Sequence, residues 1–550
     1  MRGWLPVDCK NEIIQLLKLA GPVFISQLMI FLISFVSTVF CGHLGKTELA
    51  GVALAIAVIN VTGIAIGAGL SSAFDTLISQ TYGSGNLKRV GVILQRGILI
   101  LLLACFPCWA ILINTEPILL AFKQSPEVAR LAQLYVKIFM PALPAAFMYQ
   151  LQGRYLQNQG IMWPQVITGV IGNVLNALIN YIFLYVLNLD VAGSAIANAI
   201  SQSSLAVLLC IYIWWMGLHK ATWDGWSRDC LQEWGLFTQV AIPSMLMMCL
   251  EWWIFEIGGF LAGMISEVEL GAQSIVYELA TVIFMFPLGF SVAASIRVGN
   301  ALGAGNTELA KTSSKVSIIC AFIVSCFVGA ILGFSKNVIG YIFTTDQETV
   351  QRVADVMILY VFFYPVDAIA AVTGGIVRGA GKQRTGAVCN LVGYYCIGFP
   401  IGVYLMFTAK MGIAGLWLGL FVCVALQSTF FIIFLCKLNW RKATEEALVR
   451  AGVQVTETKE LLAMENMGHD LTAEKEAEVN SLSSDFLSYE EWDSDLEEPA
   501  SGQAGRATAT VGGVLSFRQL LLRRGLTLLF MVLLLAAGIF TSELLIRLLK

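Results

Sequence analysis

Charged residues are scarce in this chain. Asp, Glu, Lys and Arg make up 13% of its 550 residues, about half the share found in soluble globular proteins. Apolar residues make up 57%, and the mean hydropathy is +0.76, which excludes a soluble globular protein. Apolar runs of about 20 residues match membrane-spanning helices, whereas a membrane β-strand needs only about 9 to 11 residues. The sequence therefore predicts an all-α polytopic membrane protein.

Motifs for several other functions are also missing. The chain has no GxxxxGK[ST] run, so no ATP site is expected. Its three histidines, His43, His219 and His469, are widely separated, and most of its 13 cysteines lie inside apolar runs. We therefore expect no metal site, no cofactor, no nucleic-acid partner and no enzymatic activity. The start, MRGWLPVDCK, lacks the features of a secretory signal, so the first span is expected to be retained.

The apolar runs predict thirteen membrane spans. They lie near residues 20–41, 49–72, 91–113, 131–153, 163–187, 192–216, 236–263, 270–295, 313–335, 353–374, 385–408, 411–436 and 520–545. The predicted organisation is an N-terminal segment 1–19, an N-lobe 20–216, a connection 217–235, a C-lobe 236–437, a linker 438–519 and a thirteenth span 520–545.

Lysine and arginine residues predict how the chain is oriented. The segment before span 1 and the even-numbered connections hold 18 of these residues, whereas the odd-numbered connections hold seven. Positive residues collect on the cytoplasmic side of a membrane. We therefore expect a multi-pass plasma-membrane protein with a cytoplasmic amino terminus and, after thirteen spans, an extracellular carboxyl terminus.

The linker 438–519 differs from the rest of the chain in its charge. Residues 443–516 contain 16 Asp or Glu and four Lys or Arg, including the run YEEWDSDLEE at 489–498. An acidic stretch with few apolar residues buries too little surface to order itself. We predict a disordered cytoplasmic tether for the thirteenth span. Regulation through the serines of this segment is the alternative.

The two halves of the chain repeat each other. Shifts of 220 or 221 residues superimpose Pro22 on Pro243, Pro144 on Pro365, Gly83 on Gly303 and Gly153 on Gly374. Each repeat has six spans, so both start from the same side of the membrane. This predicts two six-helix bundles related by a pseudo-two-fold axis along the membrane normal, with a substrate cleft between them near the midplane. Rocking of the bundles would give alternating access, which is typical of secondary transporters.

Four acidic residues lie inside apolar runs, all in the second half: Glu251, Glu256, Glu278 and Asp367. An ionised acid at the bilayer centre costs roughly 2.5 to 3.5 kcal/mol, so it needs a partner, a proton or a water-filled cavity. Under the 221-residue shift, apolar residues occupy all four equivalent positions in the first half. This asymmetry favours an ion- or cation-handling site in the C-lobe.

The glutamates also have structural interpretations. Glu251 and Glu256 are five residues apart, about 140° around a helix, so they cannot point at the same place. One of them could face the cleft while the other makes an internal hydrogen bond. The same alternative applies to Glu278.

The aspartates in or near the apolar runs also have structural interpretations. Asp367 lies two residues after Pro365 and could bond backbone groups that the proline leaves free. Asp75 and Asp355 lie nearer the ends of predicted spans, where water reaches them, so we interpret both as ordinary boundary residues.

Membrane carboxylates suggest exchange of a proton for a cation. Removal from water favours the neutral form of a carboxyl group, and a nearby cation favours the ionised form, so proton and cation compete. Four aromatic residues flank the acids: Trp252, Trp253, Phe255 and Tyr277. Ring faces attract organic cations by roughly 0.5 to 2 kcal/mol each, which favours hydrophobic organic cations as substrates. The alternative is that these rings face lipid or pack between helices.

Several motifs carry a resemblance to a known family. They are FCGHLG at 40–45, TLISQTYGSGN at 76–86, EWW at 251–253, GAQSIVYELA at 271–280, SVAASIRVGNALGAGN at 291–306 and GGIVRGAGKQ at 374–383. Over about residues 15–440 the chain resembles the multidrug and toxin extrusion family, and closely its vertebrate proton-coupled branch. The resemblance implies twelve core helices in two lobes and a plasma-membrane exporter that exchanges organic cations, drugs included, for protons. We expect it to act as a monomer.

The resemblance also implies roles for individual residues. Family members use membrane acids at the positions of Glu251, Glu256, Glu278 and Asp367 for cation recognition and proton coupling. Vertebrate relatives usually have Glu at the position of Asp367, which is one methylene shorter. Three alternatives stay open: sodium-coupled efflux, lipid flipping by the same fold, and a channel or receptor.

Overall fold

The computed structural model describes residues 7–41, 44–453 and 514–549, and all the regular structure in these ranges is helical. Within them, thirteen helices are long and apolar enough to cross a membrane. The predicted all-α architecture with a thirteenth C-terminal span is therefore confirmed. Residues 1–6, His43, His469 and residues 454–513 of the predicted linker lie outside the described ranges.

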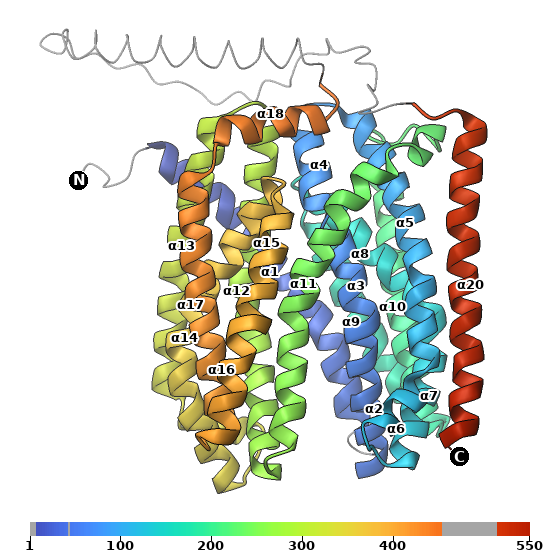
Figure 1. The fold of residues 1–550 in the computed structure, drawn as a ribbon, viewed down its shortest axis with the longest axis vertical. Helices are drawn as coiled ribbons and strands as arrows, with labels where there is room; N and C mark the ends of the chain where they lie inside the picture. Colours follow the sequence, from blue (N-terminus) through green and yellow to red (C-terminus); the bar gives the residue numbers. More distant parts are fainter. Residues whose placement is uncertain (1–6, 42–43, 454–513, 550) are drawn as a thin grey trace, which may run out of the picture.

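Two groups of helices form the lobes (Figure 1). The N-lobe contains α1 (Val7–Cys41), α2 (Lys46–Ile59), α3 (Ala65–Ser71), α4 (Phe74–Gly83), α5 (Leu87–Ile113), α6 (Thr115–Ala121), α7 (Pro126–Phe139), α8 (Leu143–Gln157), α9 (Trp163–Tyr181) and α10 (Asp190–Trp215). The C-lobe contains α11 (Trp234–Gly263), α12 (Glu267–Gly303), α13 (Thr307–Ser335), α14 (Gln347–Gly379), α15 (Gln383–Asn390), α16 (Phe399–Val403) and α17 (Ile413–Lys437). Two further helices follow, α18 (Trp440–Arg450) and α20 (Phe517–Leu549).

Short segments of other helix types complete the spans and connections. The π-helical segments are η1 (Asn60–Ile64), η3 (Ile182–Val186), η6 (Leu391–Gly398) and η7 (Tyr404–Thr408). The 3-10 segments are η2 (Met140–Ala142), η4 (Arg228–Leu231) and η5 (Ile339–Ile342).

The internal repeat is visible in backbone detail. The fifth span of each lobe ends in a π-helical segment, η3 in the N-lobe and η7 in the C-lobe, at equivalent places in the two repeats. A backbone hydrogen bond of 3.0 Å closes each turn, from Leu189 N to Phe183 O and from Met411 N to Leu405 O. The end of the fifth span therefore folds in the same way in both repeats.

The first helix of each lobe packs on both lobes. α1 contacts α9 of its own lobe and α12 of the other, while α11 contacts α15 of its own lobe and α3 of the other. Phe24 of α1 stacks on Phe286 of α12, with ring centroids 4.2 Å apart. Gly69 of α3 leaves room for the backbone of Met245 on α11, because a Cβ at Gly69 would lie 2.6 Å from the Met245 Cα. α1 and α11 therefore form part of the lobe interface.

Two glutamates at equivalent repeat positions tie each lobe to the other. Glu12 on α1 pairs with Arg297 on α12, with Nε–Oε1 and Nη2–Oε2 distances of 2.9 and 2.6 Å. Glu233, 221 residues later, directly precedes α11. Its Oε2 lies 2.9 Å from Arg89 Nη2 and 3.4 Å from Arg96 Nη2, both on α5, and all three side chains are buried. These crossed ion pairs anchor the lobes at the α18 end of the bundle.

Glu233→Gln is expected to destabilise the protein strongly. The substitution removes the carboxylate charge from two buried arginines, and breaking such a buried pair costs about 3 to 5 kcal/mol. Denaturant or thermal unfolding of the purified protein measures this loss. Asp224→Asn is the matched control, because Asp224 pairs with Lys88 at 3.3 Å on the surface and contributes less than about 1 kcal/mol. Equal losses in both variants would contradict the expectation.

The start of the predicted disordered linker is helical. Residues Trp440–Arg450 form α18, which lies across one end of the bundle (Figure 1). Its buried face includes Ala443, Ala447 and Leu448. The average acidity of residues 443–516 hid this short amphipathic stretch, in which small residues recur every four positions.

α18 holds the two lobes together at this end. Glu446 Oε2 lies 2.6 Å from Lys382 Nζ of the C-lobe and 3.3 Å from Arg450 Nη2. Arg450 Nη1 donates to Gln80 Oε1 of the N-lobe at 3.2 Å. Partial burial opposes ionisation of Glu446, but the hydrogen bond and charge of Lys382, with the charges of Arg450 and Lys442, lower its pKa.

The lowered pKa of Glu446 predicts a pH-dependent contribution to stability. The contribution is present above the ordinary glutamate pKa and is lost as the pH falls through the lowered value. Glu446→Gln is therefore expected to lower the melting temperature at neutral pH, and the difference is expected to shrink as the pH falls below the ordinary glutamate pKa of about 4.3 and to vanish below the lowered pKa. Because Glu446 is one-third exposed, the loss is at most about 1 kcal/mol. A pH-independent difference between the two proteins would refute this account.

The thirteenth span packs against the N-lobe. α20 lies along α5 (Figure 1), and Asn114 Nδ2 donates to Gly538 O at 3.0 Å. Near its start, Arg524 donates to Leu231 O at 2.7 Å and lies 4.2 Å from the ring centroid of Trp234. The start of α1 and the end of α20 lie at opposite ends of the bundle (Figure 1).

Candidate functional site

Glu251 and Asp367 form one acidic pair in the C-lobe. Glu251 lies on α11, two turns after Pro243, and Asp367 lies on α14, just after Pro365. The two carboxylates interact electrostatically. Glu251 also interacts with the guanidinium of Arg378, which is on α14. Asp367 is buried and Glu251 is half-buried.

Glu256 and Glu278 form a second pair around Tyr277. The Tyr277 hydroxyl donates to Glu256 Oε1 at 3.3 Å, and Glu278 interacts electrostatically with Glu256. Glu256 is on α11, whereas Tyr277 and Glu278 are on α12. The structure therefore divides the four acids into two pairs, and Glu251 and Glu256 face different neighbours, as their spacing predicted.

Asp367 does not bond backbone groups near Pro365. Within the described part of the chain, its carboxylate makes no hydrogen bond, while the neighbouring Val366 carbonyl accepts one from Ser428 Oγ at 2.9 Å. The Tyr364 hydroxyl donates to Ile283 O at 3.0 Å, on α12. Hydrogen bonds made by its neighbours therefore hold this part of α14, and the Asp367 carboxylate takes no part in them but interacts electrostatically with Glu251.

The aromatic residues beside the acids differ in their surroundings. Trp253 Nε1 donates to Val61 O of the N-lobe at 3.0 Å, so this ring joins the lobes. Trp252 is 38% exposed. Phe255 packs inside the C-lobe, with its centroid 5.9 Å from that of Trp417 and 6.2 Å from that of Tyr277. Phe255 therefore belongs to the packing, as the structural alternative proposed, and Tyr277 lies closest to the acids.

Asp75 was wrongly interpreted as a boundary residue. It is 1% exposed, because the helical span continues past its predicted end to Gly83. Arg154 Nη1 lies 3.1 Å from its Oδ2, and Arg378 Nε lies 3.6 Å from the same atom. The sequence did contain a sign of this longer span, because Asp75 is the only charged residue between positions 49 and 83.

The charges around the acids do not balance. Asp75 interacts with Arg154 and Arg378, and Glu251 interacts with Arg378 only. Among the described residues, the electrostatic partner of Asp367 is Glu251 rather than a cation. For Glu256 and Glu278, the residues that the structure describes supply no cation in an ion pair or among their electrostatic partners. If both members of each pair were ionised, the pairs would carry excess negative charge inside the membrane, and this favours a bound proton or cation.

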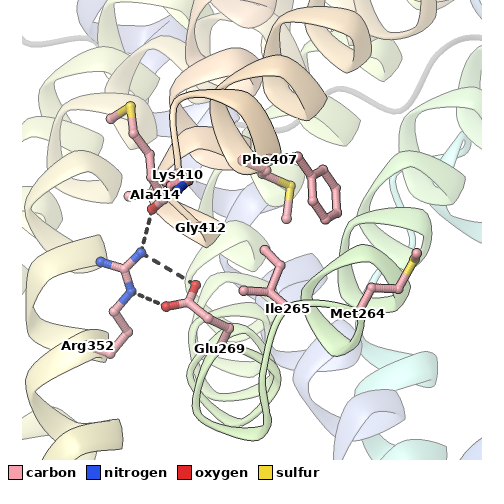
Figure 2. A pocket seen from close by; sticks show the side chains of 10 residues that line it. Met264, Ile265, Glu269, Arg352, Phe407, Lys410, Gly412 and Ala414 are labelled. Carbon is pink, nitrogen blue, oxygen red and sulfur yellow. Dashed lines mark hydrogen bonds and ion pairs between the residues drawn. The ribbon is translucent and has the colours of Figure 1, made fainter.

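A pocket of about 720 Å³ lies elsewhere in the C-lobe, at the end opposite α18. Figure 2 shows Glu269 and Arg352 in its wall, with Arg352 Nε 2.7 Å from Glu269 Oε1. Arg352 also donates to Met411 O at 2.6 Å. Lys410 also lines the pocket, so its charged residues are one acid and two cations. None of the four acids lies there, and the excess of positive charge disfavours an organic cation, so this pocket is not the candidate site.

Comparison with known proteins settles the family. The MatE family model matches twice, over residues 22–182 and 243–404, so the two copies start 221 residues apart. The chain belongs to the multidrug and toxin extrusion (MatE) family. It is 69% identical to "Multidrug and toxin extrusion protein 1" of Danio rerio over 100% of this chain and 93% of that protein. Identity to the Homo sapiens protein of the same name is 52% over 96% of this chain and 93% of that protein.

Solved structures support the MatE fold. The eukaryotic MATE transporter AtDTX14 superimposes with a TM-score of 0.78 and 29% identity, covering 81% of this chain and 100% of that chain. A MATE structure in the bent conformation superimposes with a TM-score of 0.69 and 16% identity, covering 80% of this chain and 99% of that chain. The protein is thus a membrane protein of the MatE transporter family, and its two lobes correspond to the two copies of the family model.

Proposed function

We propose that this protein exports organic cations in exchange for extracellular protons. The observation that carries the proposal is the presence of two carboxyl pairs inside membrane-spanning helices, Glu251 with Asp367 and Glu256 with Glu278, without enough nearby cations to balance their ionised forms. Each pair needs a positive charge, which a proton or an organic cation can supply. Occupation by one excludes the other, so movement of the two becomes coupled.

The relatives support an organic cation as the substrate. The curated relatives are named for multidrug and toxin extrusion. The Tyr277 hydroxyl donates to Glu256, and aromatic ring faces attract soft cations. Substrate would bind in the cleft predicted between the lobes near the midplane, where α1 and α11 meet the opposite lobe.

The orientation follows from the positive residues. The α18 end carries most lysines and arginines outside the apolar cores and is assigned to the cytoplasm. Export then runs from the α18 end towards the opposite end, across the plasma membrane. The protein works as a monomer, since each chain contains both lobes and both acid pairs.

Uptake of labelled tetraethylammonium into membrane vesicles tests the proposal. An imposed pH gradient is expected to drive concentrative uptake, and replacement of sodium by potassium is expected to leave uptake unchanged. Uptake that needs sodium but ignores the pH gradient would favour the sodium-coupled alternative. Lipid flipping without any cation uptake would favour a flippase, and non-concentrative flux would favour a channel.

A further inference from the structure

Arg378 lies between the acid pair of the C-lobe and the N-lobe. Its Nη2 donates to Ser291 Oγ at 3.0 Å, which holds the side chain within the C-lobe. Its Nε lies 3.6 Å from Asp75 Oδ2 across the lobe interface. Its backbone carbonyl accepts from Thr76 Oγ1 of the N-lobe at 2.5 Å. Arg378 therefore belongs to the contact that joins the lobes at the cytoplasmic end.

The partners of Arg378 are carboxylates on opposite lobes. Its guanidinium interacts with Asp75 of the N-lobe and with Glu251 of the C-lobe. Asp75 has a second cation, Arg154, on its own lobe, and Asn158 Nδ2 lies 3.4 Å from its Oδ1. Asp75 thus keeps Arg154 and Asn158 when the lobes separate, whereas Arg378 keeps the Ser291 hydroxyl and, as its carboxylate partner, Glu251.

The charge of Glu251 therefore changes the cost of separating the lobes. While Glu251 is ionised, its negative charge offsets the positive charge of Arg378, so the C-lobe presents little net charge to Asp75. Once a proton or an organic cation neutralises Glu251, the charge of Arg378 attracts Asp75 across the interface without that opposition. Such an attraction is stronger in a closed, poorly hydrated contact than in water. Occupation of Glu251 is thus expected to favour the state in which the cytoplasmic ends are closed.

We infer that Arg378 is a positioning residue that links the charge of Glu251 to closure of the cytoplasmic lobe contact through Asp75. This inference rests on the proposed function, because it connects proton or cation binding at Glu251 to closure of the lobes at their cytoplasmic ends. The other charged and titratable groups that interact with this set are Arg154, Asp367, Tyr394 and Cys423.

A labelling experiment tests the link without measuring transport. Ser79 is buried on α4, where its hydroxyl faces Gly299 of α12, so a thiol there is reached only when the lobes part. Ser79→Cys is made in the full-length protein in inside-out vesicles, and alkylation of this position by a membrane-impermeant maleimide is followed by mass spectrometry of its peptide. Because only the peptide that contains position 79 is followed, alkylation of the native cysteines does not contribute to the measured rate.

Glu251→Gln, which is permanently neutral, is expected to slow labelling by about fivefold or more, within the usual range of coupling between sites. The slowing should disappear in the Arg378→Gln background and persist in Arg378→Lys, which keeps the charge. The slowing should also persist in the Arg297→Gln background. Arg297 forms a different cross-lobe ion pair, with Glu12, and is not an electrostatic partner of Glu251 or Asp75. The amount of folded protein in each membrane is measured alongside.

Two outcomes overturn the inference: no slowing by Glu251→Gln in the otherwise unchanged protein, or equal slowing with Arg378→Gln. Both can occur while wild-type vesicles still exchange tetraethylammonium for protons, which would leave the proposed function intact. Conversely, the labelling pattern can hold while uptake ignores the pH gradient, which would reject the proposed function and retain the structural link.

Discussion

Glu251→Gln and Glu278→Gln are each expected to abolish pH-gradient-driven exchange of organic cations. Each change removes one ionisable group from one acid pair, so that pair can no longer alternate between a proton and a cation. The glutamine amide keeps the size of the side chain, so packing is preserved. Tetraethylammonium uptake into vesicles gives the activity, and surface labelling gives the amount of protein, which is expected to stay near that of the wild type.

Glu308→Gln is the matched control for these variants. Glu308 is an exposed glutamate at the start of α13, 2.6 Å from Lys311 Nζ, and its replacement is expected to leave exchange unchanged. A large fall in surface protein for Glu251→Gln or Glu278→Gln would instead assign these acids to folding. Retained exchange in either variant would remove that residue from the coupling site.

Much of the fold could be predicted because its determinants are local or periodic. Apolar runs define the spans, and the constant offset between Pro22 and Pro243 defines the duplication, which the family model reproduces at the same offset. The helix of α18 was missed because its apolar periodicity is short and lies at the edge of a strongly acidic segment. The average composition of residues 443–516 therefore conceals where the helix ends and the acidic segment begins.

The acid pairs could be predicted only in part. Spacing alone separated Glu251 from Glu256, but the pairing of each with a partner from another helix depends on how α11 packs against α12 and α14. The sequence contains no local sign that Glu251 is near Asp367 rather than Glu278. Contacts between distant segments follow from tertiary packing, which hydropathy does not report.

Asp75 shows the opposite error. The predicted second span ended too early, so this carboxylate was placed in water, whereas it is buried between Arg154 and Arg378. Arg378 itself was counted among the cytoplasmic positive residues. A charge near the end of an apolar run can serve as an interface residue when another lobe covers it, and the orientation rule cannot distinguish the two cases.

The same interface contains two glycines that the repeat places opposite each other. Gly83 ends α4 and Gly303 ends α12, and they occupy equivalent positions in the two lobes. A Cβ at Gly83 would overlap the backbone carbonyl of Asn300, and a Cβ at Gly303 would overlap that of Gln80. Because the obstacle is backbone rather than a flexible side chain, α4 and α12 cannot approach this closely with any other residue.

Gly83→Ala and Gly303→Ala are therefore expected to prevent closure of the cytoplasmic ends and to stop exchange. Labelling of Ser79→Cys from the cytoplasmic side should become faster in both variants, since the lobes are held apart. Gly235→Ala is the control, because a Cβ at this helical position of α11 meets nothing within 4 Å, and it should leave both labelling and exchange unchanged. Normal exchange in the Gly83 and Gly303 variants would mean that transport does not pass through this closed state. Opposite effects of the two substitutions would contradict the symmetry of the contact, since each lobe places an equivalent glycine against an equivalent backbone carbonyl of the other lobe.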